Sequence, residues 1–249
     1  MQIKIDGDYY EAKMGEFILD VTRRNSIKIP TLCHNPALPG LASCRLCIVE
    51  VIDERGSKIV TSCIYPIKKK IEVKTNSEKI IKMRKTIIKL LAARSPGNQA
   101  IRELVEEYKV NTDVFAGIFQ KDECILCGLC VKACDEIGTG AIVTVNRGII
   151  KKVSTPYDEA SEDCIGCGAC SEICPTDAIP IEERNGIRTI WNKDFQLLKC
   201  LKCGKYFSTK EEFEYINKKL GNEDCELICK DCKRKILAKE FKEIFKGIR

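Results

Sequence analysis

The sequence contains little of what enzymes use for acid–base catalysis. Its 249 residues include a single histidine, His34. A Ser–His or Cys–His catalytic pair is therefore not expected. No phosphate-binding P-loop motif occurs, and Gly138-Thr139-Gly140 lacks the third glycine of a dinucleotide fingerprint. The chain is expected to have no flavin site, no nicotinamide site and no catalytic residue of its own.

Long apolar segments and ordinary core residues are also scarce. No stretch reaches the roughly 18 apolar residues that a membrane-spanning helix needs, and the first residues, MQIKIDGDYYEAK, lack the apolar region of a secretory signal. Aromatic residues make up 6% of the chain, and its 44% hydrophobic content includes the cysteines. We therefore expect a cytoplasmic protein without membrane insertion, whose interior is built partly around groups bound by cysteine.

What the sequence has in abundance is cysteine, with 17 residues. In a reducing compartment, cysteines are metal ligands or redox groups rather than disulfides. They form four groups along the chain: Cys33, Cys44, Cys47 and Cys63; Cys124, Cys127, Cys130 and Cys134; Cys164, Cys167, Cys170 and Cys174; and Cys200, Cys203, Cys225, Cys229 and Cys232.

The two middle groups repeat one spacing, Cys-x2-Cys-x2-Cys-x3-Cys. This is the pattern of bacterial ferredoxins with two [4Fe–4S] clusters, in which the fourth cysteine of each run binds the other cluster. We expect this fourth cysteine to begin a helix, and zinc is the disfavoured alternative. The predicted ligands of site A are Cys124, Cys127, Cys130 and Cys174, and those of site B are Cys164, Cys167, Cys170 and Cys134.

The first group combines an isolated cysteine, a close pair and a distant fourth cysteine. On spacing alone this order favours a [2Fe–2S] cluster with ligands Cys33, Cys44, Cys47 and Cys63, and zinc is the alternative. A Rieske centre needs two histidines and is excluded. His34 is interpreted as a structural or hydrogen-bonding residue beside a ligand.

The last group contains two knuckles, Cys200-x2-Cys203-Gly204 and Cys229-x2-Cys232. Their separation is close to that of a zinc ribbon. We predict one Zn²⁺ with the ligands Cys200, Cys203, Cys229 and Cys232. A fourth iron–sulfur cluster and free thiols are the alternatives. Cys225 is left over, and in a cluster it would be able to replace a knuckle ligand.

Hydrophobic periodicity predicts an α+β fold in four parts. These are a β-rich [2Fe–2S] domain (1–75), a helical connector (76–117), a two-cluster ferredoxin domain (118–185) and a zinc-ribbon-like domain with a terminal helix (186–249).

Several helices are also predicted. The first domain is expected to contain one over 16–24. In the connector, Thr75 and Glu78 fit a capping box, and Asn98 caps a second helix. The first connector helix has an apolar period made by Ile80, Met83, Ile87, Ile88 and Leu91. The terminal helix is amphipathic, with a face that packs either on its own domain or on a partner; this face carries Ile236, Leu237, Phe241, Ile244, Phe245 and Ile248.

The residues around the cluster motifs resemble known families. The segments Ile29-Pro30-Thr31-Leu32-Cys33-His34 and Ser43-Cys44-Arg45-Leu46-Cys47-Ile48-Val49-Glu50-Val51 are similar to the N-terminal ferredoxin domain of two of them. These are the large iron–sulfur subunit of complex I and the accessory region of [FeFe]- and NAD(P)-linked hydrogenases. The segments Cys124-Ile125-Leu126-Cys127-Gly128, Cys134-Asp135-Glu136 and Asp163-Cys164-Ile165-Gly166-Cys167-Gly168 resemble their next domain. Over roughly residues 1–185, the resemblance implies a β-grasp fold holding [2Fe–2S], followed by a ferredoxin-like domain.

Two features of these families are missing. They usually carry another cluster, held by one histidine and three cysteines, but residues 94–114 contain neither residue type. The catalytic domain of [FeFe]-hydrogenases is absent too. The way in which electrons cross the connector is therefore left open by the sequence.

The sequence predicts an electron-transfer subunit of an oxidoreductase complex. It would relay electrons between a flavin/NAD(P)-binding subunit and a catalytic subunit, and the favoured interpretation is a multi-subunit hydrogenase, including the electron-bifurcating kind. Soluble ferredoxin is a further exchange partner. The same relay in a molybdenum or tungsten formate dehydrogenase or aldehyde oxidoreductase is the alternative, and a redox-sensing regulator is a minor one.

The net charge of +6 does not favour nucleic acid as a partner. Each predicted cluster or zinc site with four thiolates carries about −2, so the four sites together offset the formal charge. The basic balance is therefore interpreted as compensation for buried cluster charge.

Overall fold

The computed structural model of the chain describes residues 1–112, 123–221 and 225–246, the last three of these by their backbone alone. The helices are α1 (Ile18–Arg24), α2 (Glu78–Arg94), α3 (Gln99–Glu107), α4 (Leu129–Ile137), α5 (Ala169–Glu172), α6 (Lys210–Leu220) and α7 (Lys230–Lys246), with short 3-10 turns η2 (Gly148–Ile150) and η3 (Pro156–Asp158). The strands are β1 (Gln2–Ile5), β2 (Asp8–Glu11), β3 (Ile48–Asp53), β4 (Gly56–Thr61), β5 (Glu72–Lys74), β6 (Val143–Val145), β7 (Lys152–Ser154), β8 (Glu182–Arg184), β9 (Ile187–Ile190), β10 (Lys193–Lys199) and β11 (Tyr206–Thr209).

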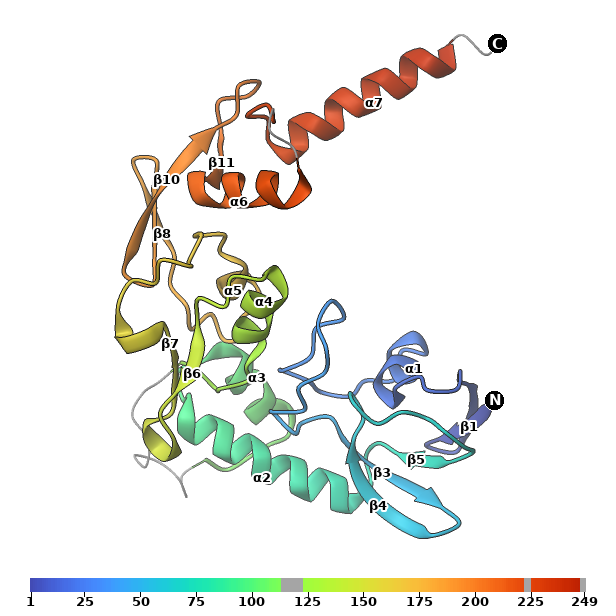
Figure 1. Cartoon of the computed structure of the whole chain (residues 1–249). Helices are drawn as coiled ribbons and strands as arrows, with labels where there is room; N and C mark the ends of the chain where they lie inside the picture. Colours follow the sequence, from blue (N-terminus) through green and yellow to red (C-terminus); the bar gives the residue numbers. More distant parts are fainter. Residues whose placement is uncertain (113–122, 222–224, 247–249) are drawn as a thin grey trace.

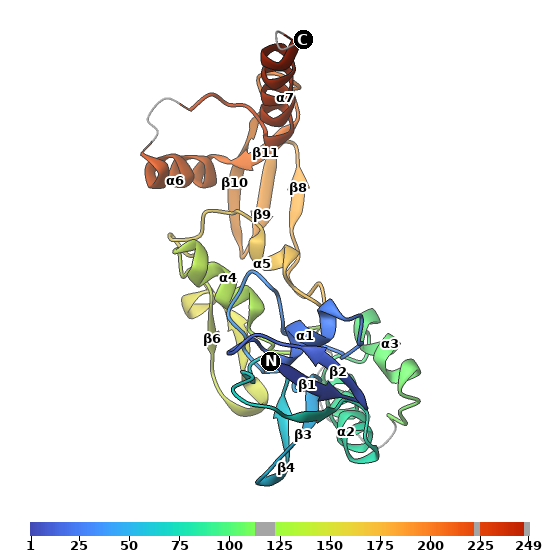
Figure 2. The same ribbon diagram turned by 90° about the vertical axis from the view of Figure 1, so that its right-hand side faces the viewer.

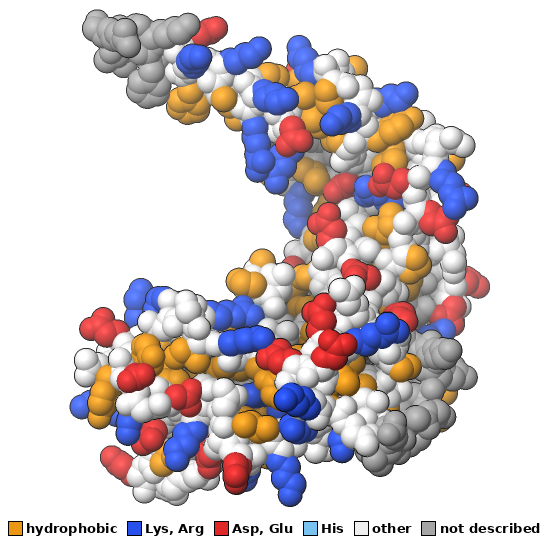
Figure 3. Space-filling model, turned by 180° about the vertical axis from the view of Figure 1, so that it is seen from behind, with side chains coloured by type: hydrophobic (Ala, Val, Ile, Leu, Met, Phe, Trp, Pro, Cys, Tyr) orange, Lys and Arg blue, Asp and Glu red, His pale blue; other side chains and the backbone are white. Residues whose placement is uncertain are grey.

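The chain is curved (Figures 1 and 2). The sheet of β1–β5 lies at one end of the curve, α4 and α5 lie in the middle, and β8–β11 with α6 and α7 form the other end. Seen from behind, the surface has a hollow between the two ends (Figure 3). The predicted α+β class is confirmed, and the order of the parts follows the sequence.

The amino-terminal domain is a five-stranded mixed sheet in the order β2-β1-β5-β3-β4. The turn between β1 and β2 lies at Asp6 and Gly7, both with positive φ, as the hairpin pattern predicts. The buried Ile5, Leu19 and Val51 belong to one core, so α1 packs against the sheet. This strand order with a packed helix is the β-grasp arrangement that the resemblance implied. The helix begins at Ile18, two residues later than expected.

The connector has the two predicted helices, but the first is capped differently. Ser77, not Thr75, caps α2, because its hydroxyl accepts a hydrogen bond from the backbone N–H of Ile80. The predicted capping box at Thr75 is wrong: the Thr75 hydroxyl and backbone N–H both donate to the carboxylate of Asp6. Asn98 caps α3 as predicted.

The buried face of α2 also differs from its predicted apolar face. Met83 is 40% exposed, whereas Arg84 is fully buried among the described residues. Ile80 and Ile88 are buried on the same side, one helical turn before and after Arg84. The polar neighbours of Arg84 explain this exchange and are described below.

The middle part holds α4, α5 and the β6–β7 hairpin. Both helices begin after a left-handed glycine, Gly128 or Gly168. The prediction that the fourth cysteine of each run begins a helix is wrong, since Cys134 lies within α4 and Cys174 follows the end of α5. The predicted boundary between residues 117 and 118 lies outside the described residues.

A four-stranded sheet, β11-β10-β9-β8, begins the last part of the chain. β8 and β9 pair as a hairpin across the domain boundary predicted between residues 185 and 186. α6 follows β11 directly and is capped by Thr209. α7 projects from the end of the molecule (Figure 1). On α7, Ile236 packs against the buried cluster of Cys200, Ile228 and Cys229 and Leu237 is exposed, while the predicted Ile248 lies outside the described residues.

Candidate iron–sulfur and metal centres

In the structure all 17 cysteines are free thiols, and most of them are at least partly buried. The four thiols of the amino-terminal group fall into two pairs. The sulfurs of Cys47 and Cys63 lie 3.3 Å apart, and the backbone N–H of Cys44 donates to the sulfur of Cys33 at 3.3 Å. A [2Fe–2S] cluster needs two thiolates on each of its irons, so two pairs of buried thiols fit it.

The places of these cysteines in the fold agree with the interpretation of their spacing as a [2Fe–2S] ligand set. Cys44 and Cys47 lie in the loop before β3, and Cys63 follows β4, the partner of β3. A hydrogen bond with Cys33 lowers the pKa of the Cys44 thiol to about 6. A hydrogen bond with Cys63 lowers the pKa of Cys47 to about 7. One thiol of each pair is thus readily ionised, as metal ligation requires.

Site A is a cavity between the start of α4 and the segment that follows α5. The structure brings together the four cysteines predicted for it: Cys124, Cys127, Cys130 and Cys174. Backbone N–H groups point at two of these sulfurs. Leu126 donates to Cys124 at 3.4 Å and Ala178 to Cys174 at 3.3 Å.

Site B is a second cavity, between α4 and the start of α5. Its lining includes all four predicted ligands: Cys134, Cys164, Cys167 and Cys170. The hydroxyl of Thr139 lies 3.1 Å from the Cys134 sulfur. The crossed pattern follows from the fold, because α4 and α5 pack together. Cys134, within α4, lines the cavity of the second run, and Cys174, just after α5, lines the cavity of the first.

Burial makes several thiols of these two cavities hard to ionise. It raises the pKa of Cys127 to about 11, that of Cys130 to about 12 and that of Cys170 to about 11. Buried thiols with raised pKa values gain little from the protein as thiolates. Iron ions would supply the missing positive charge, so the donor set fits a cluster in each cavity.

The carboxy-terminal cysteines form a tighter group. The sulfurs of Cys200, Cys203, Cys229 and Cys232 all lie within 4.8 Å of one another. The backbone N–H of Cys229 lowers the pKa of Cys200 to about 6, and the Cys203 and Cys229 sulfurs are 3.8 Å apart. Cys225 is partly buried and is not in this group of four.

Sequence reasoning missed two residues near these centres. The guanidinium of Arg84 donates to the backbone carbonyls of Leu46 and Ile48, on either side of Cys47, at 3.0 and 2.9 Å. Trp191 lines both site A and site B. Arg84 is a charged residue within the apolar period of α2, and this was a signal for its buried position. Trp191 is the only tryptophan in the sequence, and this was a weak signal for its place between the two sites. His34 contacts Arg23 through its Nδ1 at 2.9 Å, in agreement with a hydrogen-bonding role.

Comparison with protein families supports this interpretation of the cysteines. Residues 1–78 match the 2Fe-2S iron-sulfur cluster binding domain, and residues 117–181 match the 4Fe-4S dicluster domain. The chain has a [2Fe–2S] ferredoxin domain and a [4Fe–4S] dicluster domain. Residues 182–249 lie beyond both matches.

Whole proteins with similar sequences are components of oxidoreductases. The chain is 30% identical over 214 residues to the NADP-reducing hydrogenase subunit HndD of Solidesulfovibrio fructosivorans, covering 72% of this chain and 36% of that protein. It is 26% identical over 203 residues to the NADH-ubiquinone oxidoreductase 75 kDa subunit of Reclinomonas americana, covering 72% of this chain and 29% of that protein. The chain thus spans only a minor part of the length of these relatives.

A solved structure shows the same relationship. A chain of an NAD⁺-reducing [NiFe]-hydrogenase in its H2-reduced state matches with a TM-score of 0.62 and 26% identity, over 71% of this chain and 85% of that one. The chain resembles the N-terminal iron–sulfur part of these oxidoreductases. No helix among the described residues is both long enough and apolar enough to cross a bilayer.

Proposed function

We propose that the chain is an electron-relay subunit of a multi-subunit oxidoreductase. In this role Cys33, Cys44, Cys47 and Cys63 hold one [2Fe–2S] cluster, and sites A and B each hold one [4Fe–4S] cluster. When bound, such clusters accept and release single electrons. The side chains of this protein hold the clusters and fix their spacing. The family matches and the convergence of each predicted set of thiols support this assignment.

The observation that carries the proposal is a continuous buried contact between the centres. Cys33 and Cys44 of the amino-terminal domain lie in one apolar cluster with Cys127 of site A. Leu46 and Ile88 fill the space in the same cluster. This contact supports direct electron transfer between the two domains. The sequence had left that step open, because the histidine-containing cluster usual in the related families is missing.

The path continues from site A to site B. Cys130 of site A packs in one apolar cluster with Cys134, Cys164 and Cys170 of site B. The three centres would then be neighbours in the order amino-terminal centre, site A, site B. A relay of this kind needs a donor at one end and an acceptor at the other. We infer a flavin/NAD(P)-binding subunit and a catalytic subunit of a hydrogenase.

For the carboxy-terminal group we propose a single Zn²⁺. Four thiolates around one zinc ion have Zn–S bonds of about 2.3 Å in a tetrahedron, which places the sulfurs roughly 3.8 Å apart. The 3.8 Å between the Cys203 and Cys229 sulfurs agrees with this value. The mutual distances within 4.8 Å leave no room for a four-iron core, so this observation favours zinc over a fourth cluster.

Metal analysis and EPR of the anaerobically purified full chain test these assignments. We expect about ten iron atoms and one zinc per chain, with EPR signals of one [2Fe–2S] and two [4Fe–4S] clusters after dithionite reduction. The Cys33→Ser variant should lose about two irons and keep both [4Fe–4S] signals. Fewer than about eight irons in the wild type would overturn the relay, and about fourteen irons without zinc would overturn the zinc site.

The partner is tested separately. Native purification of the complex from the source cells, followed by mass spectrometry, should yield a flavin/NAD(P)-binding subunit and a hydrogenase subunit. Recovery of a formate dehydrogenase or aldehyde oxidoreductase subunit instead would keep the relay and replace the catalytic partner. Recovery of the chain without any oxidoreductase subunit would overturn its place in a complex.

A further inference from the structure

The hairpin β9–β10 makes contacts that the ferredoxin domain alone does not explain. It lies beyond residues 117–181, which match the dicluster domain, yet it reaches back to the cavity of site B. Phe195 of β10 packs so closely over Gly166 that a Cβ atom there would lie 2.6 Å from its ring. Thr209, at the end of β11, donates to the carbonyl of Ile165 at 2.6 Å. The added sheet therefore covers the loop that carries Cys164 and Cys167.

Trp191 lies at the turn of this hairpin and points into the cluster region. Its indole Nε1–H donates to the sulfur of Cys170 at 3.5 Å, and its side chain lines the cavities of both sites. Trp191 and Asn192 have φ values of 51° and 59°, the two positive φ angles that a two-residue type I′ turn between paired Ile190 and Lys193 requires. The turn thus places a bulky indole, where asparagine or glycine is usual, against the sulfur of Cys170.

Two cations of the same hairpin hold the loop of site B by its backbone. The ammonium of Lys193 donates to the carbonyls of Ser161, Glu162 and Cys164 at 2.9, 3.1 and 2.9 Å. Arg188 donates to the carbonyl of Gly166 at 2.8 Å and is also paired with Glu183. Lys193 is therefore the less neutralised of the two charges beside site B.

The first turn of α6 lies beside the same loop. Thr209, the N-cap of α6, donates to the carbonyl of Ile165, and Glu211 and Glu212 are the acidic residues of that first turn. The Oε2 atom of Glu211 is buried without a hydrogen-bond partner among the described residues. The loop of site B thus meets a donor and a cation from the hairpin and the acidic first turn of α6.

We propose that the β9–β10 hairpin sets the reduction potential of site B, with Trp191 and Lys193 as its positioning residues. This inference rests on the proposed function, since it requires a [4Fe–4S] cluster in site B. Reduction adds one negative charge to a cluster, and an N–H···S bond or a nearby cation stabilises the reduced form more than the oxidised form. Both residues therefore raise the potential, and Glu211 lowers it.

The test is an EPR-monitored redox titration of the full chain with its clusters. Trp191→Phe keeps the aromatic ring and removes the N–H, and Lys193→Met removes the cation. Each should lower the midpoint potential of site B and leave that of site A nearly unchanged, so site A serves as an internal reference. Lys193→Arg should restore most of the loss, and Glu211→Gln should shift the midpoint in the opposite direction.

Lys152→Met is the matched control. It removes a lysine of the same domain that pairs with Asp158 at 2.7 Å, and both midpoints should stay at wild-type values. Unchanged site B midpoints in Trp191→Phe and Lys193→Met, with both cluster signals intact, would overturn the inference and leave the proposed function standing. A wild-type chain without two [4Fe–4S] signals would instead overturn the proposed function. Equal shifts at both sites would also overturn the assignment of the hairpin to site B.

Discussion

The Nε of Arg84 on α2 donates a hydrogen bond to the carbonyl oxygen of Leu46 at 3.0 Å, and Leu46 lies between the predicted ligands Cys44 and Cys47. The same guanidinium reaches the carbonyls of Ile48 and Thr75 at 2.9 and 3.2 Å. A connector helix is thereby fixed to the loop that carries half of the predicted [2Fe–2S] ligands.

Replacing Arg84 should destabilise the amino-terminal half of the chain. In Arg84→Met the buried carbonyls lose their donor, and each buried polar group left unpaired costs about 1–3 kcal/mol. We expect the free energy of unfolding to fall by about 3 kcal/mol or more, measured by urea unfolding with far-UV circular dichroism. Lys82→Met, an exposed change on the same helix, is the control. A loss below about 1 kcal/mol in Arg84→Met would show that these bonds are replaceable.

The loop of site B should tolerate no side chain at Gly166. Gly166 has a φ of +67°, and a Cβ atom there would lie 2.6 Å from the ring of Phe195. Gly166→Ala should therefore lose site B and about four irons. Gly140→Ala is the matched control, because Gly140 has a φ of +58° and open space around its Cβ position. It carries only the backbone strain and should keep full iron content. Equal iron content in both variants would contradict the predicted clash.

The carboxy-terminal knuckles should lose their metal when any one ligand is changed. Cys229→Ser removes a buried sulfur of the tight group, and we expect its zinc content to fall from about one per chain to near zero. Cys225→Ser changes the cysteine outside that group and should keep its zinc. Zinc in both variants is measured by inductively coupled plasma mass spectrometry. Loss of metal in Cys225→Ser alone would show that Cys225 replaces a knuckle ligand.

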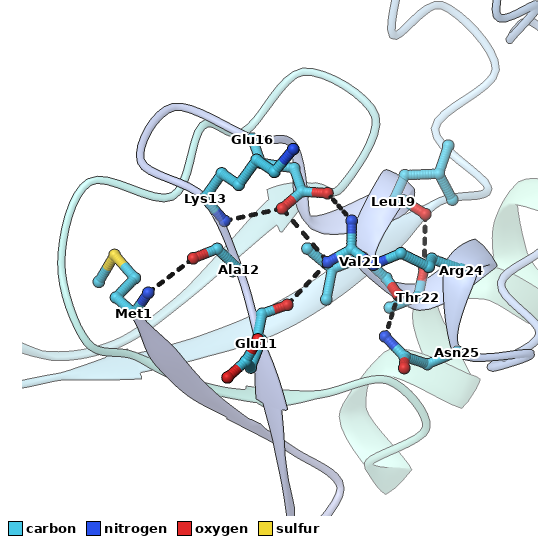
Figure 4. A network of polar contacts seen from close by, with 10 residues as sticks. All are labelled: Met1, Glu11, Ala12, Lys13, Glu16, Leu19, Val21, Thr22, Arg24 and Asn25. Atoms are coloured by element: carbon cyan, nitrogen blue, oxygen red, sulfur yellow. Dashed lines mark hydrogen bonds and ion pairs between the residues drawn. The ribbon is translucent and has the colours of Figure 1, made fainter.

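A polar network at the start of α1 should make stability depend on acid pH. Glu16 accepts from the backbone N–H of Lys13 at 2.8 Å and is bound by Arg24, which also donates to the Glu11 carbonyl (Figure 4). The Arg24 guanidinium holds the pKa of the Glu16 carboxyl below its usual 4.5. The folded pKa lies below the unfolded one, so this contribution is complete above about 4.5 and is lost as the pH falls through the folded value.

Glu16→Gln tests that dependence. The variant should be slightly less stable than the wild type at pH 7. The difference should begin to shrink as the pH falls below about 4.5 and be lost as the pH falls through the folded pKa of Glu16. Urea midpoints followed by circular dichroism from pH 7 down to about pH 2 measure it. Glu54→Gln, in the exposed turn between β3 and β4, should show neither effect. A stability difference for Glu16→Gln that persists at low pH would contradict the role of the ionised carboxylate.

Cysteine spacing carried the sequence-based assignment of the domains. Ligand spacing within a run, such as Cys164-x2-Cys167-x2-Cys170, is a local property of the chain. The loop must wrap a cluster with consecutive residues, so the pattern is visible without the fold. The caps were less predictable: Thr75 and Ser77 both offer a hydroxyl, and only the position of Asp6, brought close by the sheet, decides that Thr75 is used elsewhere.

By itself, the sequence determined the four cysteine groups, the α+β class and the order of the domains, because these depend on spacing and on hydrophobic period. Only the tertiary structure decided what surrounds the predicted ligand cysteines. Arg84 is buried because carbonyls from 36 and 38 residues away meet it. Trp191 reaches the sulfur of Cys170, which lies 21 residues earlier in the chain, because the hairpin that follows the ferredoxin domain folds back onto it. Contacts of this kind join segments with no common period, so no local pattern in the sequence encodes them.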